Sequence, residues 1–164
     1  MTSEHLLHTI PPIYDGNSKI LILGSFPSVK SREVSFYYGH PQNRFWRVLA
    51  AVLGCAVPSS NEEKTALLQS HNIALWDVIK SCDIVGSSDS SIKNVVPNDI
   101  GVILSSCGIR QIYSNGKTSE KLFNKYIKDT VGRDTVALPS TSPANASYNL
   151  ERLTDSWSVI KNNI

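Results

Sequence analysis

A run of aromatic and amide side chains between residues 36 and 46 offers more chemistry than any other part of the sequence. Tyr37 and Tyr38 are adjacent in an expected loop, where both rings cannot easily be buried, so one ring is predicted to be free to stack on a planar base. Asn43 is expected in the first turn of a helix beginning at Pro41, where the helix dipole favours an anion. A helix-capping or surface role for the Asn43 amide is an equally open interpretation.

A second amide, Asn115, follows an expected strand. Its carboxamide can both donate to and accept from one base edge, although an Asn-Gly turn is the simpler interpretation. The succeeding residues Gly116, Lys117 and Thr118 do not complete a phosphate-binding P-loop. That pattern requires a glycine where the chain has Gln111, so the P-loop interpretation is rejected.

The remaining candidate ligands do not predict a metal site. His5 and His8 have a spacing that metal ligands use, but no partner carboxylates stand at useful spacing, so a solvated tail is expected. The three cysteines, Cys55, Cys82 and Cys107, contain no Cys-x-x-Cys pair, which argues against zinc and iron–sulfur centres. We therefore expect no metal and no other cofactor.

Four short apolar runs predict β-strands, and segments of helical periodicity lie between them. Strands are expected at residues 19–24, 73–79, 109–116 and 135–139. Helices are expected from Pro41 to Leu53, from Ser60 to Leu68 after a capping box at residues 60–63, and at residues 122–127 and 150–160. Strands that alternate with helices predict an α/β protein with a parallel sheet covered on both faces.

One connection is much longer than a typical strand-to-helix loop. About 17 residues separate Gly24 from Pro41, whereas such loops usually have two to six. Open parallel sheets bind ligands beyond the carboxyl ends of their strands. The polar segments that follow Gly24, Asn115 and Pro139 are therefore predicted to meet at one rim of the sheet and to form the binding site.

Length and composition predict one folded domain, residues 1–164, with residues 1–15 as a peripheral segment. Hydrophobic residues make up 41% of the chain and charged residues 18%, which excludes a disordered chain. No apolar run approaches the roughly 20 residues of a membrane span, and no secretory signal is recognisable. We therefore expect a cytoplasmic protein without a membrane partner. The net charge of +2 permits a nucleic-acid partner without requiring one.

Three segments, in this order, resemble motifs of the uracil-DNA glycosylase superfamily. Residues 24–28 (GSFPS) resemble its first motif, G-x-x-P, and residues 138–145 (LPSTSPAN) resemble its second. Residues 40–46 (HPQNRFW) are similar to the H-P-x-N-R-F-W of the mismatch-specific glycosylases, and the most similar branch is the hypoxanthine-DNA (deoxyinosine) glycosylases of family 6. The resemblance covers residues 19–160. It implies a three-layer α/β/α fold around a mostly parallel four-stranded sheet, and excision of a damaged base from DNA.

The resemblance also implies roles for individual residues. Tyr38 would stack on the flipped base, Asn115 would read its edge and Asn43 would carry catalysis. The base pocket would further include Gly24, Ser25 and Phe26. Contacts with the DNA backbone would come from Ser28, Ser140, Thr141, Ser142, Asn145, Arg44 and Lys117. A residue of the 142–145 loop would fill the gap left by the extruded nucleotide.

Two positions depart from the family pattern. Phe26 stands where many members have Asp or Asn to position the attacking water, and Leu138 stands where many have His or Asn to stabilise the leaving base. Both departures shift the catalytic role to Asn43. The motifs place no lysine nucleophile, so the resemblance implies a monomeric, monofunctional hydrolase that removes hypoxanthine, or else uracil or xanthine, from DNA. A non-catalytic DNA-binding module and a hydrolase of free nucleosides remain alternatives.

Overall fold

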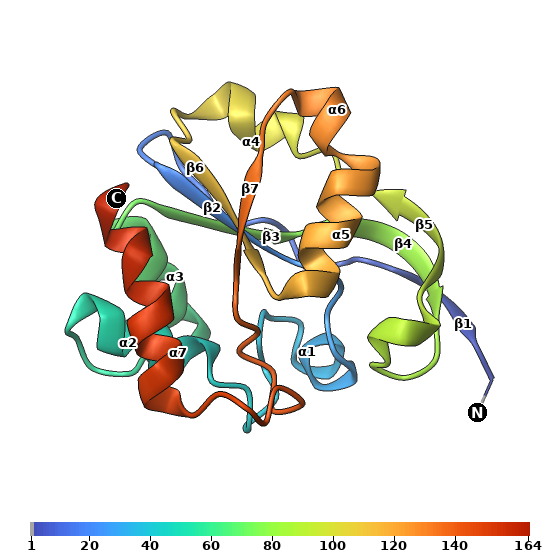
Figure 1. Cartoon of the computed structure of the whole chain (residues 1–164), viewed down its shortest axis with the longest axis horizontal. Helices are drawn as coiled ribbons and strands as arrows, with labels where there is room; N and C mark the ends of the chain where they lie inside the picture. The colour runs from blue at the N-terminus through green and yellow to red at the C-terminus, as the bar shows by residue number, and fades with distance from the viewer. Residues whose placement is uncertain (1) are drawn as a thin grey trace.

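The computed structural model describes residues 2–164, and its central element is a four-stranded parallel sheet (Figure 1). The strands are β2 (Ile20–Gly24), β3 (Ile73–Asp77), β6 (Gln111–Asn115) and β7 (Thr135–Leu138). They lie in the order β3-β2-β6-β7, and every neighbouring pair is parallel. The expected α/β fold with a four-stranded parallel sheet is confirmed.

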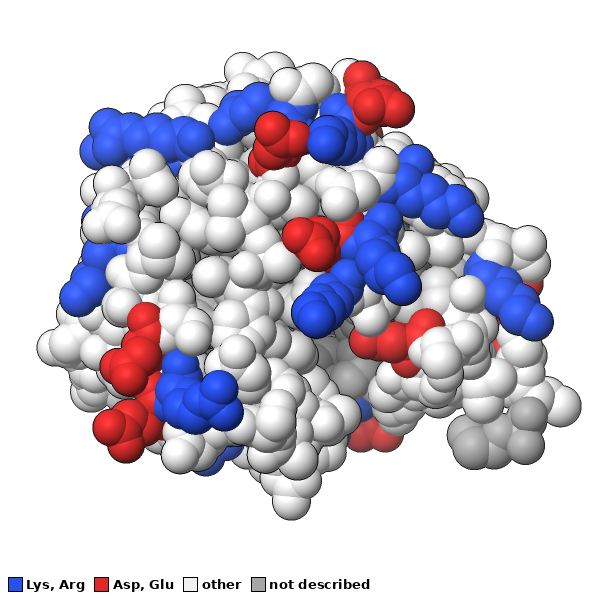
Figure 2. All heavy atoms as spheres, in the orientation of Figure 1, with Lys and Arg blue, Asp and Glu red and all other residues white. Residues whose placement is uncertain are grey.

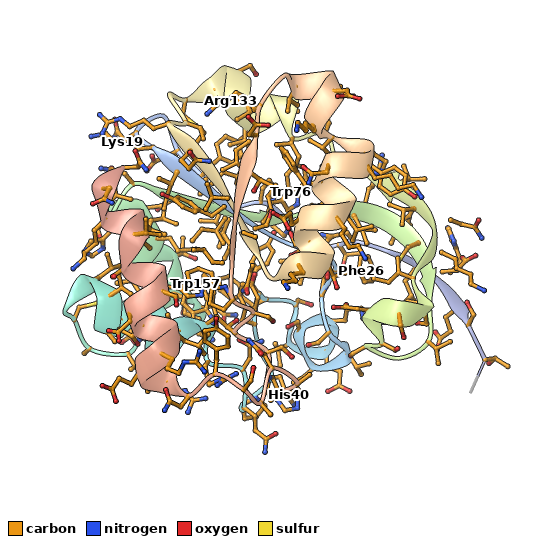
Figure 3. The ribbon with its side chains drawn as sticks, viewed as in Figure 1. Lys19, Phe26, His40, Trp76, Arg133 and Trp157 are labelled. Carbon is orange, nitrogen blue, oxygen red and sulfur yellow. The ribbon has the colours of Figure 1, made fainter. Side chains whose placement is uncertain are left out.

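Helices cover both faces of this sheet (Figure 1). Successive side chains of a strand point to opposite faces, so Ile20 and Ile22 of β2 enter one core while Leu21 and Leu23 enter the other. The first face is covered by α2 (Phe45–Leu53), α3 (Asn61–Ser70) and α7 (Leu150–Trp157), the second by α4 (Gly101–Ser106), α5 (Lys117–Tyr126) and α6 (Lys128–Val131). Trp157 of α7 is fully buried in the first core (Figure 3). Within residues 2–164, no helix is both long enough and apolar enough to cross a lipid bilayer.

The helix after the long loop begins later than the sequence predicts. Helix α2 starts at Phe45, not at Pro41, because residues before it form a turn. The Asn43 side-chain oxygen accepts the backbone N–H of Phe45 at 3.0 Å. A short polar side chain that takes up backbone N–H groups competes with helix formation, which explains the late start. Asn43 thus precedes the helix and does not lie in its first turn.

A second, three-stranded antiparallel sheet was not predicted. It has the order β1-β4-β5 and consists of β1 (Glu4–Leu7), β4 (Ile79–Ile84) and β5 (Lys93–Pro97). The predicted end of the strand at residues 73–79 is therefore wrong, because β3 ends at Asp77 and a separate strand, β4, begins at Ile79. Helix α1 (Val29–Val34) and two 3₁₀ turns, η1 (Asp89–Ser91) and η2 (Ser158–Asn162), complete the chain.

The N-terminal segment belongs to the fold, which corrects the prediction of a solvated tail. Strand β1 pairs with β4, and Ile10 and Ile13 are buried in the first core. The side chain of His8 is only 1% exposed. The sequence concealed this arrangement because β1 has four residues, most of them exposed.

Candidate active site

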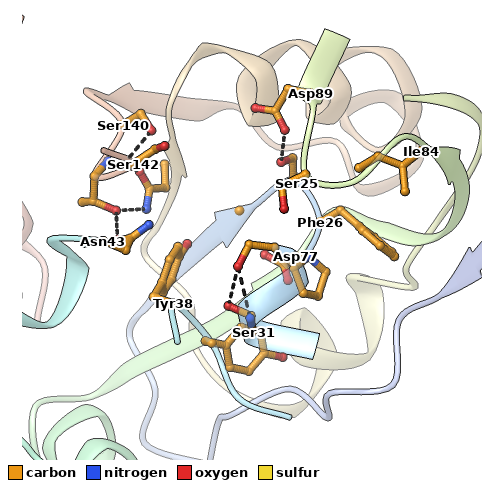
Figure 4. Close-up of a pocket in the computed structure, with 17 residues that line it drawn as sticks. Ser25, Phe26, Ser31, Tyr38, Asn43, Asp77, Ile84, Asp89, Ser140 and Ser142 are labelled. Atoms are coloured by element: carbon orange, nitrogen blue, oxygen red, sulfur yellow. Dashed lines mark hydrogen bonds between the residues drawn. The ribbon is translucent and has the colours of Figure 1, made fainter. Parts of the chain in front are cut away.

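A pocket of about 160 Å³ opens beyond the carboxyl ends of the parallel strands (Figure 4). The three segments that the sequence predicts to converge do meet there. The predicted site residues that line the pocket are Gly24, Ser25, Phe26, Ser28, Tyr38, Asn43, Asn115, Ser140, Thr141 and Ser142. Three others, Arg44, Lys117 and Asn145, lie outside the lining.

The two adjacent tyrosines take different places. Tyr37 is 2% exposed and its hydroxyl donates to the Pro11 carbonyl at 2.8 Å. Tyr38 has a φ of 53°, which turns its side chain away from that of Tyr37 and towards the pocket. Its ring stacks on Phe45 with centroids 4.1 Å apart and planes inclined by 19°. A base in the pocket would extend this stack.

The Tyr38 hydroxyl is buried and has no hydrogen-bond partner among residues 2–164. Burial raises the pKa of Tyr38 far above its ordinary value, and the negative charge of Asp77 raises it further, while the nearby Asn115 amide opposes the shift. The hydroxyl therefore stays protonated. A buried donor without a partner is costly, so it is suited to a ligand oxygen or nitrogen.

Thr141 connects the two amides that the sequence singles out. Its hydroxyl donates to Asn43 Oδ1 at 2.9 Å and accepts from Asn115 Nδ2 at 3.0 Å, and its backbone N–H donates to Asn115 Oδ1 at 3.0 Å. Because Asn43 Oδ1 also accepts from the backbone of Phe45, the orientation of this amide is determined. Asn43 Nδ2 has no partner among residues 2–164 and faces the pocket (Figure 4).

Arg44 orders the loop after β7, and the phosphate contact that the resemblance implies for it stays a prediction. Its guanidinium donates to the carbonyl oxygens of Ser142 at 2.9 Å, of Asn145 at 3.1 Å and of Tyr148. Asn145 also acts within the loop, because its Nδ2 donates to the Ser140 carbonyl at 3.0 Å. Both residues thus hold Ser140 and Ser142 at the mouth of the pocket.

The first motif forms the opposite wall. Ser28 caps α1, with its hydroxyl accepting the backbone N–H of Ser31 at 3.1 Å. Phe26 lies at the pocket and meets the ring of His8 edge-on, with centroids 6.0 Å apart. A Cβ on Gly24 would lie 2.4 Å from Asp77 Oδ1, so the glycine leaves space for that carboxylate.

Asp77 and His8 are the site residues that sequence reasoning missed. Asp77 ends β3, lines the pocket and is 4% exposed. His8 Nε2 lies 2.8 Å from Asp77 Oδ2. Asp77 is an acidic residue inside the apolar run of residues 73–79. Its position was a signal of a special role, since charged groups are rarely buried without a partner. The position of His8 depends on the pairing of β1 with β4, for which the sequence held no signal.

Further charges lie at the rim of the pocket. Burial raises the pKa of Asp89, while hydrogen bonds from Thr118 and Ser25 oppose the shift. Lys and Arg side chains gather over the region where Figure 1 shows α5 (Figure 2). On α5 itself Lys117, Lys121 and Lys125 are exposed and stand one turn apart, so they share one face.

A ligand pocket beyond the carboxyl ends of the strands places the protein among the open-sheet α/β proteins that bind ligands at this edge. The family model of the uracil DNA glycosylase superfamily matches residues 11–161, and the chain belongs to that superfamily.

Two curated relatives and one solved structure are similar over most of the chain. A protein of Methanosarcina barkeri described as a hypoxanthine DNA glycosylase is 36% identical over 137 residues, 82% of this chain and 85% of the relative. A protein of Methanosarcina acetivorans with the same description is 34% identical over 152 residues, 92% and 94% of the two chains. The solution NMR structure of a proposed uracil DNA glycosylase from Methanosarcina acetivorans superposes with a TM-score of 0.79 and 33% identity, covering 93% and 94% of the two chains. The expected family and the expected class of enzyme, a DNA glycosylase, are confirmed.

Proposed function

We propose that this DNA glycosylase removes hypoxanthine from DNA and leaves an abasic site. The observation that carries the proposal is the meeting of Tyr38, Asn43 and Asn115 at one pocket. Both curated relatives are described as hypoxanthine DNA glycosylases, which favours this base over uracil or xanthine. The proposal includes the monomeric state and the cytoplasmic location expected from the sequence.

The target nucleotide must leave the DNA stack before its base can enter the pocket. Flipping costs a few kcal/mol and costs least for a mispaired base. Hypoxanthine arises from adenine and pairs poorly with the thymine opposite, so it is easily extruded. The flipped base would then lie against the Tyr38 ring, whose other face is supported by Phe45. Stacking of a base on an aromatic side chain is worth about 1–3 kcal/mol.

In the chemical step the bond between C1′ and N9 breaks, and its electron pair leaves with the base. Positive charge develops on the sugar, and water then adds to C1′ while its proton balances the departing base. Asn43 Nδ2, which has no partner among residues 2–164, would donate to the base as this negative charge grows. The Asn43–Thr141 hydrogen bond holds the donor in place before the reaction begins, which is the condition for electrostatic catalysis.

Water is the proposed nucleophile because no lysine is among the pocket-lining residues in the described part of the chain. The product is then an intact abasic strand. Serine hydroxyls at the mouth, from Ser28, Ser140 and Ser142, would contact the phosphates on either side of the flipped nucleotide. The exposed Lys117 would extend this contact along the strand without reading sequence.

The test measures single-turnover excision from duplexes that carry one hypoxanthine, uracil or xanthine, with abasic sites cleaved by alkali. Asn43→Asp keeps the oxygen that accepts from Phe45 and Thr141 but loses the Nδ2 donor. We expect it, like Asn43→Ala, to slow excision about 10²- to 10³-fold, the effect of removing one such donor. DNA affinity should change little.

Asn149→Ala is the matched control, because Asn149 caps α7 through its side-chain oxygen and lies outside the pocket lining. Wild-type excision by Asn43→Asp would refute the role of Asn43. Binding to DNA without an abasic product on any base would instead identify a non-catalytic binding module. Cleavage of free inosine, with no salt-dependent affinity for DNA, would identify a nucleoside hydrolase.

A further inference from the structure

A carboxylate in the pocket is held by a histidine that comes from the N-terminal segment. The side chains of Asp77 and His8 are 5% and 1% exposed, and His8 Nε2 lies 2.8 Å from Asp77 Oδ2. A buried charge without a partner is strongly unfavourable, so this contact determines where Oδ2 lies. The other oxygen, Oδ1, lies over Gly24. Figure 4 shows Asp77 between Tyr38 and Phe26.

The backbone around this carboxylate is also restrained. Asn98 Nδ2 donates to the carbonyls of Asp77 at 2.9 Å and Ile79 at 3.2 Å. The backbone N–H of His8 donates to the Lys80 carbonyl at 2.7 Å, which extends the pairing of β1 with β4. Oδ1 of Asp77 is therefore a hydrogen-bond acceptor at one defined position.

Deamination changes the edge of a base in a way that such an acceptor can detect. Adenine presents an acceptor at ring N1 beside an amino donor, whereas hypoxanthine presents N1–H as a donor beside a carbonyl. Cytosine and uracil differ in the same way at ring N3. An ionised carboxylate only accepts hydrogen bonds. It therefore matches the ring N–H of the deaminated base and opposes the ring lone pair of its parent.

We propose that the His8–Asp77 pair distinguishes a deaminated base from its parent, with Asp77 Oδ1 accepting the ring N–H. His8 is the positioning residue, because it prevents the carboxylate from turning towards the amino group of adenine. The inference rests on the proposed function.

The experiment compares three substitutions in the full-length protein. His8→Phe keeps a ring between Phe26 and Tyr37 but cannot donate to Asp77, whereas His8→Gln can still donate. His5→Phe is the matched control, because His5 makes a similar contact of 2.7 Å with Asp83 but is 62% exposed. Single-turnover excision of hypoxanthine, the Kd for the same duplex and thermal unfolding are measured for each.

We expect His8→Phe to slow excision about 10- to 100-fold, the range for loss of a hydrogen bond to a charged group, with an unchanged Kd. His8→Gln should recover most of the rate, and His5→Phe should match the wild type. A folded His8→Phe protein with the wild-type rate overturns the inference and leaves the proposed function intact. A wild-type protein that releases no hypoxanthine overturns both.

Asp77→Asn provides a second test that does not depend on the folding of the His8 variants. Its amide can donate to adenine N1, so the ratio of excision rates for hypoxanthine and for adenine opposite an abasic site should fall at least about tenfold. An unchanged ratio overturns the inference.

Discussion

Gly24→Ala tests whether the pocket depends on the space above this glycine. Gly24 ends β2, and an added Cβ would lie 2.4 Å from Asp77 Oδ1 and 3.0 Å from the Tyr38 hydroxyl. The first distance is about 1 Å shorter than an ordinary contact, which begins at 3.4 Å. Asp77 cannot move aside freely, because His8 holds its other oxygen and Asn98 holds its backbone carbonyl. The carboxylate or the tyrosine must therefore shift.

Gly24→Ala should lower both the free energy of unfolding and the rate of excision. Overpacking a well-filled site typically costs about 1–3 kcal/mol of unfolding free energy. A displacement of about 1 Å in a reacting site can lower the rate about 10²-fold. We expect both effects in Gly24→Ala, measured by denaturant unfolding and by single-turnover excision of hypoxanthine. Gly108→Ala is the control, because nothing lies within 4 Å of a Cβ there. Excision at the wild-type rate by Gly24→Ala would show that neither group needs its present position.

Three further predictions concern other parts of the site and the fold. Thr141→Val removes the hydroxyl between the two pocket amides, so we expect a loss of about 1–3 kcal/mol in unfolding free energy and slower excision. Thr135→Val, which removes a hydroxyl bonded within the sheet, should leave excision unchanged in the same assay. Lys117→Gln should reduce the slope of log affinity against log salt by about 1 in a fluorescence anisotropy titration, and an unchanged slope would mean that DNA does not contact this lysine. Hydrogen bonds from the Ser59 backbone and hydroxyl and from the Ser60 backbone lower the pKa of Glu63. The carboxylate therefore stabilises the folded protein at pH values above its pKa in the unfolded chain. This stabilisation is lost as the pH falls through the lowered pKa of the folded protein. The difference in Tm between wild type and Glu63→Gln should therefore disappear in acid.

The parallel sheet and the location of the pocket could be predicted because their signals are local. Continuous apolar runs such as residues 19–24 indicate buried parallel strands, and polar residues directly after them must lie at one edge of the sheet. Asn115 and the long segment after Gly24 that carries Tyr38 and Asn43 were placed at the rim in this way, whereas the roles of these three residues came from the family resemblance. The capping box at residues 60–63 was equally visible, because it depends only on neighbouring residues.

The interactions among these residues could not be predicted, because they join segments far apart in the chain. Thr141 was expected to bind DNA, yet it is fully buried between two amides. Arg44 was also expected to bind DNA, and its guanidinium in addition donates to three carbonyls of the loop after β7, which the sequence did not indicate. In both cases the polar or charged side chain alone suggested a contact with DNA. Only the tertiary contacts show that these groups order the site from within.

The tertiary contacts of Phe26 give a physical reason for an aromatic residue at this position, which the sequence alone could not supply. In the first motif it replaces the polar residue that many family members carry, and by itself this removes a carboxylate or an amide from the pocket. Its ring instead lies edge-on to His8, which is also packed against Tyr37. These rings exclude water from the His8–Asp77 contact, and a hydrogen bond between charged or polar groups is stronger when water is excluded. A polar residue at position 26 would hydrate the histidine and weaken its hold on Asp77. Phe26 of the apolar first motif and the carboxylate at the end of β3 are therefore linked through their shared contact with His8.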